Sequence, residues 1–152
     1  MNEGPQVVRM ELPASTHYLV LVRQFISSLA HQVGFIGSDV AKIELALDEA
    51  CSNSIRAIRK AEGNNPTTRL QLEIECDTQS IAISVWDNGS DFSQHFENQT
   101  PLEARIGNMQ TSGYGLQIIK TCMDQVIYKH LPGTGNLLRL VKYVEQTCEE
   151  RG

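Results

Sequence analysis

The sequence predicts an α/β (α+β) two-layer sandwich, in which helices cover one face of a mixed, mostly antiparallel sheet. Apolar residues recur at three- and four-residue steps in two N-terminal segments, which is the period of amphipathic helices. After residue 69 they alternate with polar residues, as in strands with one wet face. The expected order is strand, two helices, two strands, a long irregular stretch, one helix and two strands. Because this is not a strict βαβ alternation, it favours consecutive antiparallel strands with one helix layer.

The N-terminal part is expected to hold one strand and two helices. The strand spans residues 7–12. Ser15 is expected to cap a first helix that ends at Gly34, and Ser38 to cap a second helix that runs to about residue 61. The predicted buried stripes are Leu19, Val22, Ile26, Leu29 and Val33 in the first helix, and Ile43, Leu47, Ala50, Ser54, Ala57 and Ile58 in the second.

The C-terminal part is expected to hold four strands, one helix and a long irregular segment. That segment, DNGSDFSQHFENQTPLEARIGNMQTS, has few apolar residues and no sustained period. So long a stretch inside a compact domain is usually a functional lid or is disordered. The expected ranges are strands at 70–76 and 81–87, a lid at about 90–112, a glycine-led helix from residue 113, and strands at 126–131 and 136–144.

Length, charge and cysteine content are those of an ordinary cytosolic protein. The chain has 152 residues, and we expect one domain over 1–152 that ends in a polar tail at about 145–152. A formal net charge of −5 gives no electrostatic footprint for direct nucleic-acid or membrane binding. We see no signal peptide and no membrane span, so we expect a cytoplasmic protein. No two cysteines form a C-x-x-C pair, and buried or half-buried reduced thiols are expected at Cys51, Cys76, Cys122 and Cys148.

Glu49 and Asn53 lie four residues apart on the second predicted helix, so they share a face beside its apolar stripe. A carboxylate and an amide at the rim of a core can point into a cleft between the helices and the sheet. There they can hold a hard cation and a water or hydroxyl, since oxygen ligands suit Mg²⁺. An ordinary solvated helix edge gives the same pair, and for the pair alone this is the commoner explanation.

Asp87 ends a predicted strand on the same face as Ile81, Ile83 and Val85. If that face packs against the helices, the carboxylate needs a hydrogen-bond donor, because burying it unpaired is costly. An amino group of a ligand would serve, and Gly89 would let the backbone turn closely around that ligand. Asp-Asn-Gly is also a very common turn sequence, so this signal is weak by itself.

The segment Ser112-Gly113-Tyr114-Gly115-Leu116 lies at the start of the helix that follows the irregular stretch. Paired glycines and free N–H groups at a helix N-terminus form an anion site. A flexible hinge would carry the same glycines. The segment does not follow a strand, and no G-x-x-x-x-G-K occurs, so it is neither a dinucleotide-binding fingerprint nor a Walker loop.

In this order and spacing the three segments are much more specific. ELALDEACSNSIRAI, VWDNGSDF and SGYGLQIIKTCMDQV resemble the N, G1 and G2 boxes of the Bergerat-fold (GHKL) ATPase superfamily. More narrowly, they are similar to the small bacterial anti-sigma factor serine/threonine kinases of the sporulation and general-stress type. The similarity extends over nearly the whole chain and implies a Bergerat-type ATP-binding fold.

The resemblance implies a role for each of these residues. Glu49 matches the proposed general base and Asn53 the Mg²⁺ ligand. Arg23, on the first helix, falls where the family has an arginine used in partner docking. Asp87 matches the carboxylate that reads adenine. The other nucleotide contacts that the resemblance implies are Gly89 beside Asp87, Arg105 in the lid as a neutraliser of the γ-phosphate, and the phosphate-binding segment Ser112, Gly113, Tyr114, Gly115 and Leu116.

Two positions depart from the family pattern. Asp91 stands where the superfamily often has a second glycine after the G1 aspartate. The last turn usually reads G-T-T in the family, and its first threonine helps bind adenine. Here the turn reads Gly133-Thr134-Gly135-Asn136, so either Asn136, without a gap, or Thr134, with a small shift, takes that place.

The resemblance implies an anti-sigma factor protein serine kinase whose cofactors are ATP and Mg²⁺. Such a kinase phosphorylates a serine of a small anti-sigma-factor antagonist and sequesters a sigma factor by partner switching, and a homodimer is also implied. Two alternatives stay open: a non-catalytic ATP-binding module that sequesters a partner, and a histidine-kinase-like ATPase. Glu49 and Asn53 argue against the first alternative, whereas Asp91 and Asn136 keep it open.

Overall fold

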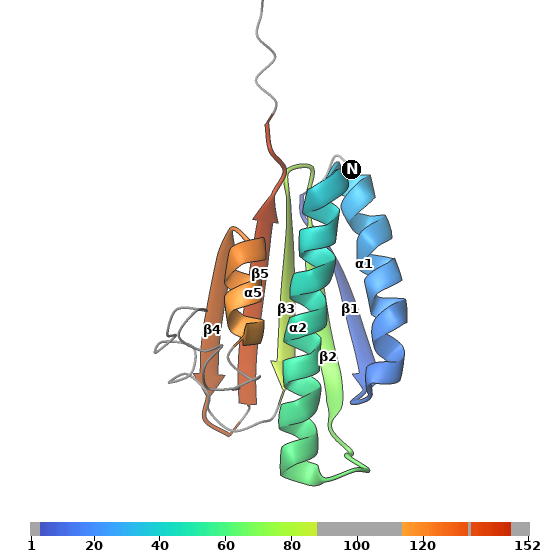
Figure 1. Cartoon of the computed structure of the whole chain (residues 1–152), viewed down its shortest axis with the longest axis vertical. Helices are drawn as coiled ribbons and strands as arrows, with labels where there is room; N and C mark the ends of the chain where they lie inside the picture. The colour runs from blue at the N-terminus through green and yellow to red at the C-terminus, as the bar shows by residue number, and fades with distance from the viewer. Residues whose placement is uncertain (1–3, 88–113, 134, 147–152) are drawn as a thin grey trace, which may run out of the picture.

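A computed structural model describes residues 4–87, 114–133 and 135–146 of the chain. In this part, helices cover one face of a five-stranded antiparallel sheet (Figure 1). The predicted two-layer sandwich is therefore confirmed, with a sheet that is antiparallel throughout, whereas the lid predicted at about 90–112 lies outside the described residues. The elements are β1 (Gln6–Pro13), the 3-10 helix η1 (Thr16–Tyr18), α1 (Leu19–Val33), α2 (Gly37–Glu62), β2 (Arg69–Cys76), β3 (Ser80–Asp87), α5 (Tyr114–Cys122), β4 (Gln125–Leu131) and β5 (Gly135–Tyr143).

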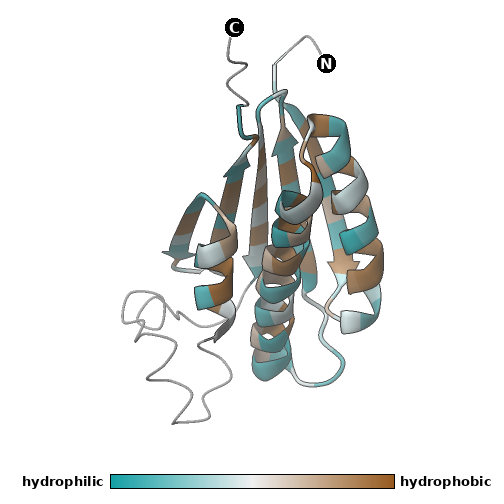
Figure 2. Ribbon diagram, turned by 45° about the horizontal axis from the view of Figure 1, so that its top comes forward, coloured by the Kyte–Doolittle hydropathy of each residue, from teal (hydrophilic) through white to brown (hydrophobic). Residues whose placement is uncertain are grey.

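The strand order is β1-β2-β3-β5-β4, and each neighbouring pair is antiparallel. The register places inward side chains opposite one another, so Ile74 faces Ile83, which in turn faces Leu140. All three are fully buried beneath the helices. Figure 2 shows the alternation of apolar and polar bands along the strands from which these elements were predicted.

The first helical segment differs from the prediction at its start. Ser15 caps η1 and not α1 itself: its hydroxyl oxygen accepts the backbone N–H of His17. α1 ends at Gly34, whose φ of 116° lies in the left-handed region that glycine adopts readily. Ala30 is fully buried in α1, while the predicted core residue Leu29 only packs partly against the core.

The cap predicted at Ser38 is wrong. α2 begins at Gly37, and the capping position is held by Ile36, whose backbone is extended and whose side chain makes no capping bond. The N–H of Asp39 instead bonds to the carbonyl of Ile36, so Ser38 already lies within the first turn. Asp39 is an acidic residue in that first turn, where the helix dipole favours a negative charge.

The prediction of buried, reduced thiols is confirmed for the cysteines in the described part. Cys51, Cys76 and Cys122 are buried and unpaired, and Cys148 lies outside the described residues. Burial raises the pKa of the Cys51 thiol far above its ordinary value, which keeps it protonated and unreactive. Across residues 4–87, 114–133 and 135–146, no helix has both the length and the apolarity needed to cross a bilayer.

Lys142 holds the helix layer at the end of the sandwich where β3 begins, which is the opposite end from Asp87. It is on the inward face of β5, opposite Ile81, and is only 6% exposed. Its Nζ donates to the carbonyl of Cys122, the last residue of α5, at 2.9 Å. The same ammonium lies 3.9 Å from Asp39 Oδ1 in the first turn of α2 and 3.9 Å from Asp124 Oδ1. One buried cation therefore joins β5, the end of α5 and the start of α2.

We predict that Lys142→Met destabilises the protein by about 1–3 kcal/mol, because methionine fills the space but leaves the buried Cys122 carbonyl without its charged donor. Urea unfolding followed by circular dichroism measures the change. Lys129→Met, at an exposed position of β4, is the matched control and should change stability by less than about 0.5 kcal/mol. Equal unfolding midpoints for the two variants would contradict the anchoring role of Lys142.

Candidate functional site

The predicted site residues that the structure describes gather at one end of the sandwich. The end of β3 and the start of β5 are neighbours in the sheet, with Asp87 opposite Asn136. The start of α5 lies at the same end, and α5 packs against α2 (Figure 1). Four elements from distant parts of the sequence therefore supply the site.

Gly115 brings the start of α5 into contact with the middle of α2. A Cβ at residue 115 would lie 2.8 Å from Glu49 Oε2 and 3.1 Å from Asn53 Nδ2. Because real Cβ atoms do not approach polar atoms at 2.8 Å, only glycine fits without displacing Glu49. The structure thus places Gly115, which belongs to the predicted phosphate-binding segment, directly against the predicted base and metal ligand.

Arg56 is a site residue that the sequence analysis did not assign. Its Nη2 donates to Asn53 Oδ1, three residues earlier on α2. The spacing of three residues along a helix was a readable signal for this contact. The bond directs a guanidinium charge at the amide oxygen that was predicted to bind Mg²⁺.

The residues present fit a nucleotide-bound Mg²⁺. Mg²⁺ usually takes one or two protein oxygens and completes its shell with phosphate oxygens and waters. Glu49 and Asn53 are half-buried on one face of α2 beside Gly115, where they present a carboxylate and an amide oxygen. Arg56 donates to that amide oxygen in this structure, so its guanidinium would have to turn away before Asn53 could bind a metal. No cluster of three or more His, Cys, Asp or Glu side chains able to hold a metal occurs in the described ranges.

Asp87 and Asn136 form a buried polar pair at the end of the inward sheet face. Asp87 is 7% exposed and Asn136 1%. Asn136 Nδ2 donates to Asp87 Oδ1 at 2.9 Å. The carboxylate therefore has the donor that its burial demands. Of the two residues proposed for the threonine position of the last turn, Asn136 is the one that the structure places beside Asp87, while Thr134 lies outside the described residues.

Two side chains of β4 contact the same amide, and the sequence analysis assigned neither. Tyr128 Oη donates to Asn136 Oδ1 at 2.6 Å. His130 Nδ1 lies 2.8 Å from the same oxygen. Both residues occupy inward positions of β4, and His130 is directly opposite Asn136 in the register. Because Tyr128 and His130 are two residues apart, the strand pattern indicates that they share a face of β4. It does not indicate that both contact Asn136.

Arg23 makes its contacts along the α1–α2 boundary. Its Nη2 lies 2.5 Å from Asp48 Oδ2, which precedes Glu49 on α2. The hydrogen bond and the charge of Asp48 raise the pKa of Arg23 above its ordinary value. Both side chains are partly exposed, so Arg23 stays accessible from solvent.

The remaining predicted contacts divide into two groups. Leu116 is buried in the core, where it packs α5 against its neighbours, and Tyr114 begins that helix. The residues that lie outside the described ranges are Gly89, Arg105, Ser112, Gly113 and Thr134.

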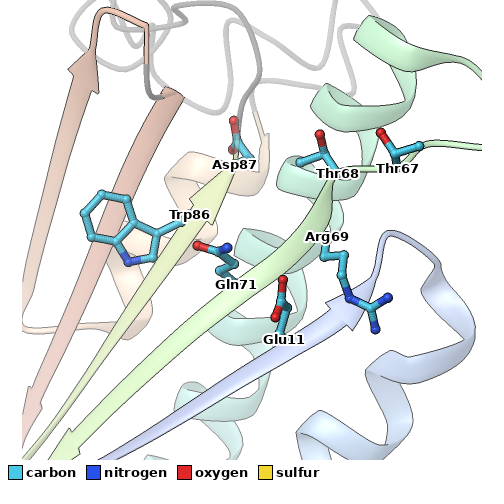
Figure 3. A pocket seen from close by; sticks show the side chains of 7 residues that line it. All are labelled: Glu11, Thr67, Thr68, Arg69, Gln71, Trp86 and Asp87. Carbon is cyan, nitrogen blue, oxygen red and sulfur yellow. The ribbon is translucent and has the colours of Figure 1, made fainter.

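A separate hollow of about 330 Å³ lies over the outer face of β2 and β3. In Figure 3 the side chains of Asp87 and Trp86 leave β3 on different sides, as successive residues of a strand do. Neither Glu49 nor Asn53 lines this hollow, so we do not assign the nucleotide to it. Its lining is Glu11, Thr67, Thr68, Arg69, Gln71, Trp86 and Asp87 (Figure 3).

The comparisons with known proteins agree with this geometry. Residues 12–142 match the family described as "Histidine kinase-like ATPase domain". The serine-protein kinase RsbW of Bacillus pumilus is 25% identical over 129 residues, which cover 83% of this chain and 80% of that protein. The RsbW protein of Halalkalibacterium halodurans is 26% identical over 144 residues, covering 93% and 86%.

A solved structure shows the same fold at lower identity. A chain in the crystal structure of the SiaB–SiaC complex from Pseudomonas aeruginosa has a TM-score of 0.68 and 11% identity, and the match covers 88% of each chain. The family match covers all the described elements from α1 to β4 and most of β5. The described residues form three α-helices packed on a five-stranded antiparallel sheet of the Bergerat type, and the match over residues 12–142 shows that this chain belongs to the histidine kinase-like ATPase domain family.

Proposed function

We propose that this protein is an anti-sigma factor protein serine kinase. It binds Mg–ATP, phosphorylates a serine of a small anti-sigma-factor antagonist, and holds a sigma factor inactive until the antagonist displaces it. The observation that supports the proposal is the position of Gly115, at which an added Cβ would lie 2.8 Å from Glu49 Oε2 and 3.1 Å from Asn53 Nδ2, so that the start of α5 adjoins the proposed base and metal ligand. The relatives named serine-protein kinase support this class of activity. The proposed homodimer rests on the family resemblance.

Positioning and charge neutralisation carry most of the chemistry of phosphoryl transfer. In the proposed mechanism the carboxylate of Glu49 accepts the proton of the incoming serine hydroxyl. Asn53 would hold Mg²⁺, which when bound offsets the charge of the phosphates. Backbone N–H groups at the start of α5 would bind phosphate oxygens. Asp87, fixed by Asn136, accepts a hydrogen bond from the adenine amino group.

Two other functions would use the same residues. A non-catalytic module would bind ATP and sequester a partner, and the departures at Asp91 and Asn136 keep this alternative open. A histidine-kinase-like ATPase would hydrolyse ATP or place the phosphate on histidine. Phosphohistidine is labile to acid and phosphoserine is not, so acid treatment of the labelled product separates these chemistries. The structural relative was solved in a complex with a partner protein. This supports the two functions that require a bound partner, the anti-sigma factor kinase and the non-catalytic module.

Glu49→Gln should lower phosphoryl transfer by roughly 10²–10⁴-fold while ADP binding stays near the wild-type value, because glutamine keeps the shape of glutamate but cannot take a proton. Transfer of labelled phosphate to a candidate antagonist and calorimetry on the same preparation measure both. Glu11→Gln, exposed on the sheet face away from the helices, is the matched control. Wild-type transfer by Glu49→Gln removes the base assignment, and ADP binding without transfer by the wild type favours the binding module.

Gly115→Ala should slow phosphoryl transfer by about tenfold to a hundredfold, because the added methyl displaces Glu49 from its position. Stability should change little, since alanine favours a helix by about 1 kcal/mol over glycine and this gain offsets part of the crowding. The comparison of transfer rate with thermal unfolding separates the two effects. Thr121→Ala, at an exposed position of the same helix, should alter neither. A Gly115→Ala protein as active as the Thr121→Ala control would show that the close contact has no catalytic role.

Arg23→Glu should weaken binding of a sigma factor or antagonist without changing ADP affinity. The variant also breaks the pair with Asp48, so the double variant Arg23→Glu with Asp48→Arg restores that pair in the opposite sense. If Arg23 contacts the partner, the double variant still fails to bind it in a pull-down. Recovery of binding by the double variant would reduce Arg23 to an intramolecular pairing role. Arg9→Glu, which alters an exposed ion pair on the outer sheet face, controls for net charge.

A further inference from the structure

The buried pair at the end of β3 is part of a larger hydrogen-bond network. Asn136 donates from its nitrogen to Asp87 and accepts at its oxygen from two side chains of β4. Three adjacent strands contribute, because β5 lies between β3 and β4 in the sheet. The register sets the network, placing Asn136 opposite Asp87 on one side and opposite His130 on the other.

The chemistry of each group fixes the direction of every bond. An ionised carboxylate only accepts, so Asn136 turns its NH₂ group toward Asp87. Its oxygen must then face Tyr128 and His130, and both must donate to it. The hydroxyl of Tyr128 does so directly, and His130 does so when Nδ1 carries a hydrogen, whether the ring is neutral or charged. The directions of the three hydrogen bonds in the network are therefore mutually consistent.

The two β4 donors support this orientation at the amide oxygen. Asn136 is only 1% exposed, so its oxygen has little access to water and the loss of either donor there is costly. A flipped amide would aim its oxygen at the Asp87 carboxylate, where two acceptors repel. Tyr128 and His130 thus stabilise one amide orientation, and this orientation leaves Asp87 as an acceptor.

We propose that Tyr128 and His130 are positioning residues that set the nucleobase specificity of the site. Through Asn136 they keep Asp87 an acceptor, which favours a base with an amino group at that place, such as adenine, over hypoxanthine, which has a carbonyl there. A site built to pair with a donor rejects the analogue that lacks it, because a buried polar group is then left unpaired. This inference rests on the proposed function, in that Asp87 must face the base.

The test measures the affinities of ADP and of inosine diphosphate (IDP), with Mg²⁺, for the full chain. Calorimetry measures the affinity of each nucleotide directly. In the wild type we expect ADP to bind about a hundredfold more tightly than IDP. Tyr128→Phe, which removes only a hydroxyl, should lower that preference about tenfold. Tyr143→Phe, on an exposed position of the outer face, should leave it unchanged.

His130 provides a second arm with a conservative rescue. The amide nitrogen of asparagine can replace Nδ1 as a donor, so His130→Asn should keep the preference, while His130→Leu should lose it. Thermal unfolding of each variant shows that the chain folds. A merely structural network predicts an unchanged ratio of ADP to IDP affinity in every folded variant, and this result would overturn the inference.

Asp87→Asn separates this inference from the proposed function. If the wild type binds neither nucleotide, or if Asp87→Asn retains the full preference for ADP, then Asp87 does not read the base, and the proposed nucleotide site and the inference both fail. If Asp87→Asn loses the preference while Tyr128→Phe and His130→Leu retain it, the inference alone fails. Loss of preference in all three, with rescue by His130→Asn, supports both.

Discussion

The first turn of α5 approaches α2 so closely that a Cβ at residue 115 would lie 2.8 Å from Glu49 Oε2 and displace that carboxylate. α5 has only nine residues, and an isolated helix of this length is not stable in water. Its position must therefore come from its neighbours. At its start it lies against Glu49 and Asn53, and at its end the Cys122 carbonyl accepts a bond from Lys142. The helix is thus held at both ends to elements on which the site is built.

The inward face of β3 and β5 is apolar in its middle and polar at both ends. At one end lies Lys142, and at the other lie Asp87 and Asn136. All three are buried, and each has hydrogen-bond partners that offset the cost of removing it from water. The two ends differ in what they contact. Lys142 contacts the end of α5 and the start of α2, so its partners belong to the helix layer. Asp87 is the last residue of β3 and lies at the candidate site.

Local periodicity was enough to predict the elements and part of the site. Glu49 and Asn53 share a helix face whatever the tertiary structure, and alternation along β3 turns Asp87 inward. The network around Asn136 was not predictable in this way. It depends on β5 pairing with β3 on one side and with β4 on the other, and the β3–β5 pair joins residues about fifty positions apart.

Other misses have their own physical causes. Arg56 lies three residues after Asn53 on α2, a spacing that permits their contact, but only the side-chain conformation shows that the contact is made. The prediction that Ser38 caps α2 was wrong because the helix already begins at Gly37, which leaves Ser38 inside its first turn. Lys142 interrupts the apolar alternation of β5, and its partners lie at the ends of two helices that sequence spacing does not bring together.

The last turn shows how a departure from a family pattern can be compensated within one structure. A threonine hydroxyl has a single hydrogen to donate, so one bond to an aspartate would use it fully. Asparagine also donates to Asp87, but its amide carries an oxygen that must be satisfied as well. That need is met by Tyr128 and His130, which lie on the strand beside it. Asn136 is therefore satisfied together with the two donors of β4, and the three residues form one hydrogen-bonded unit beside Asp87.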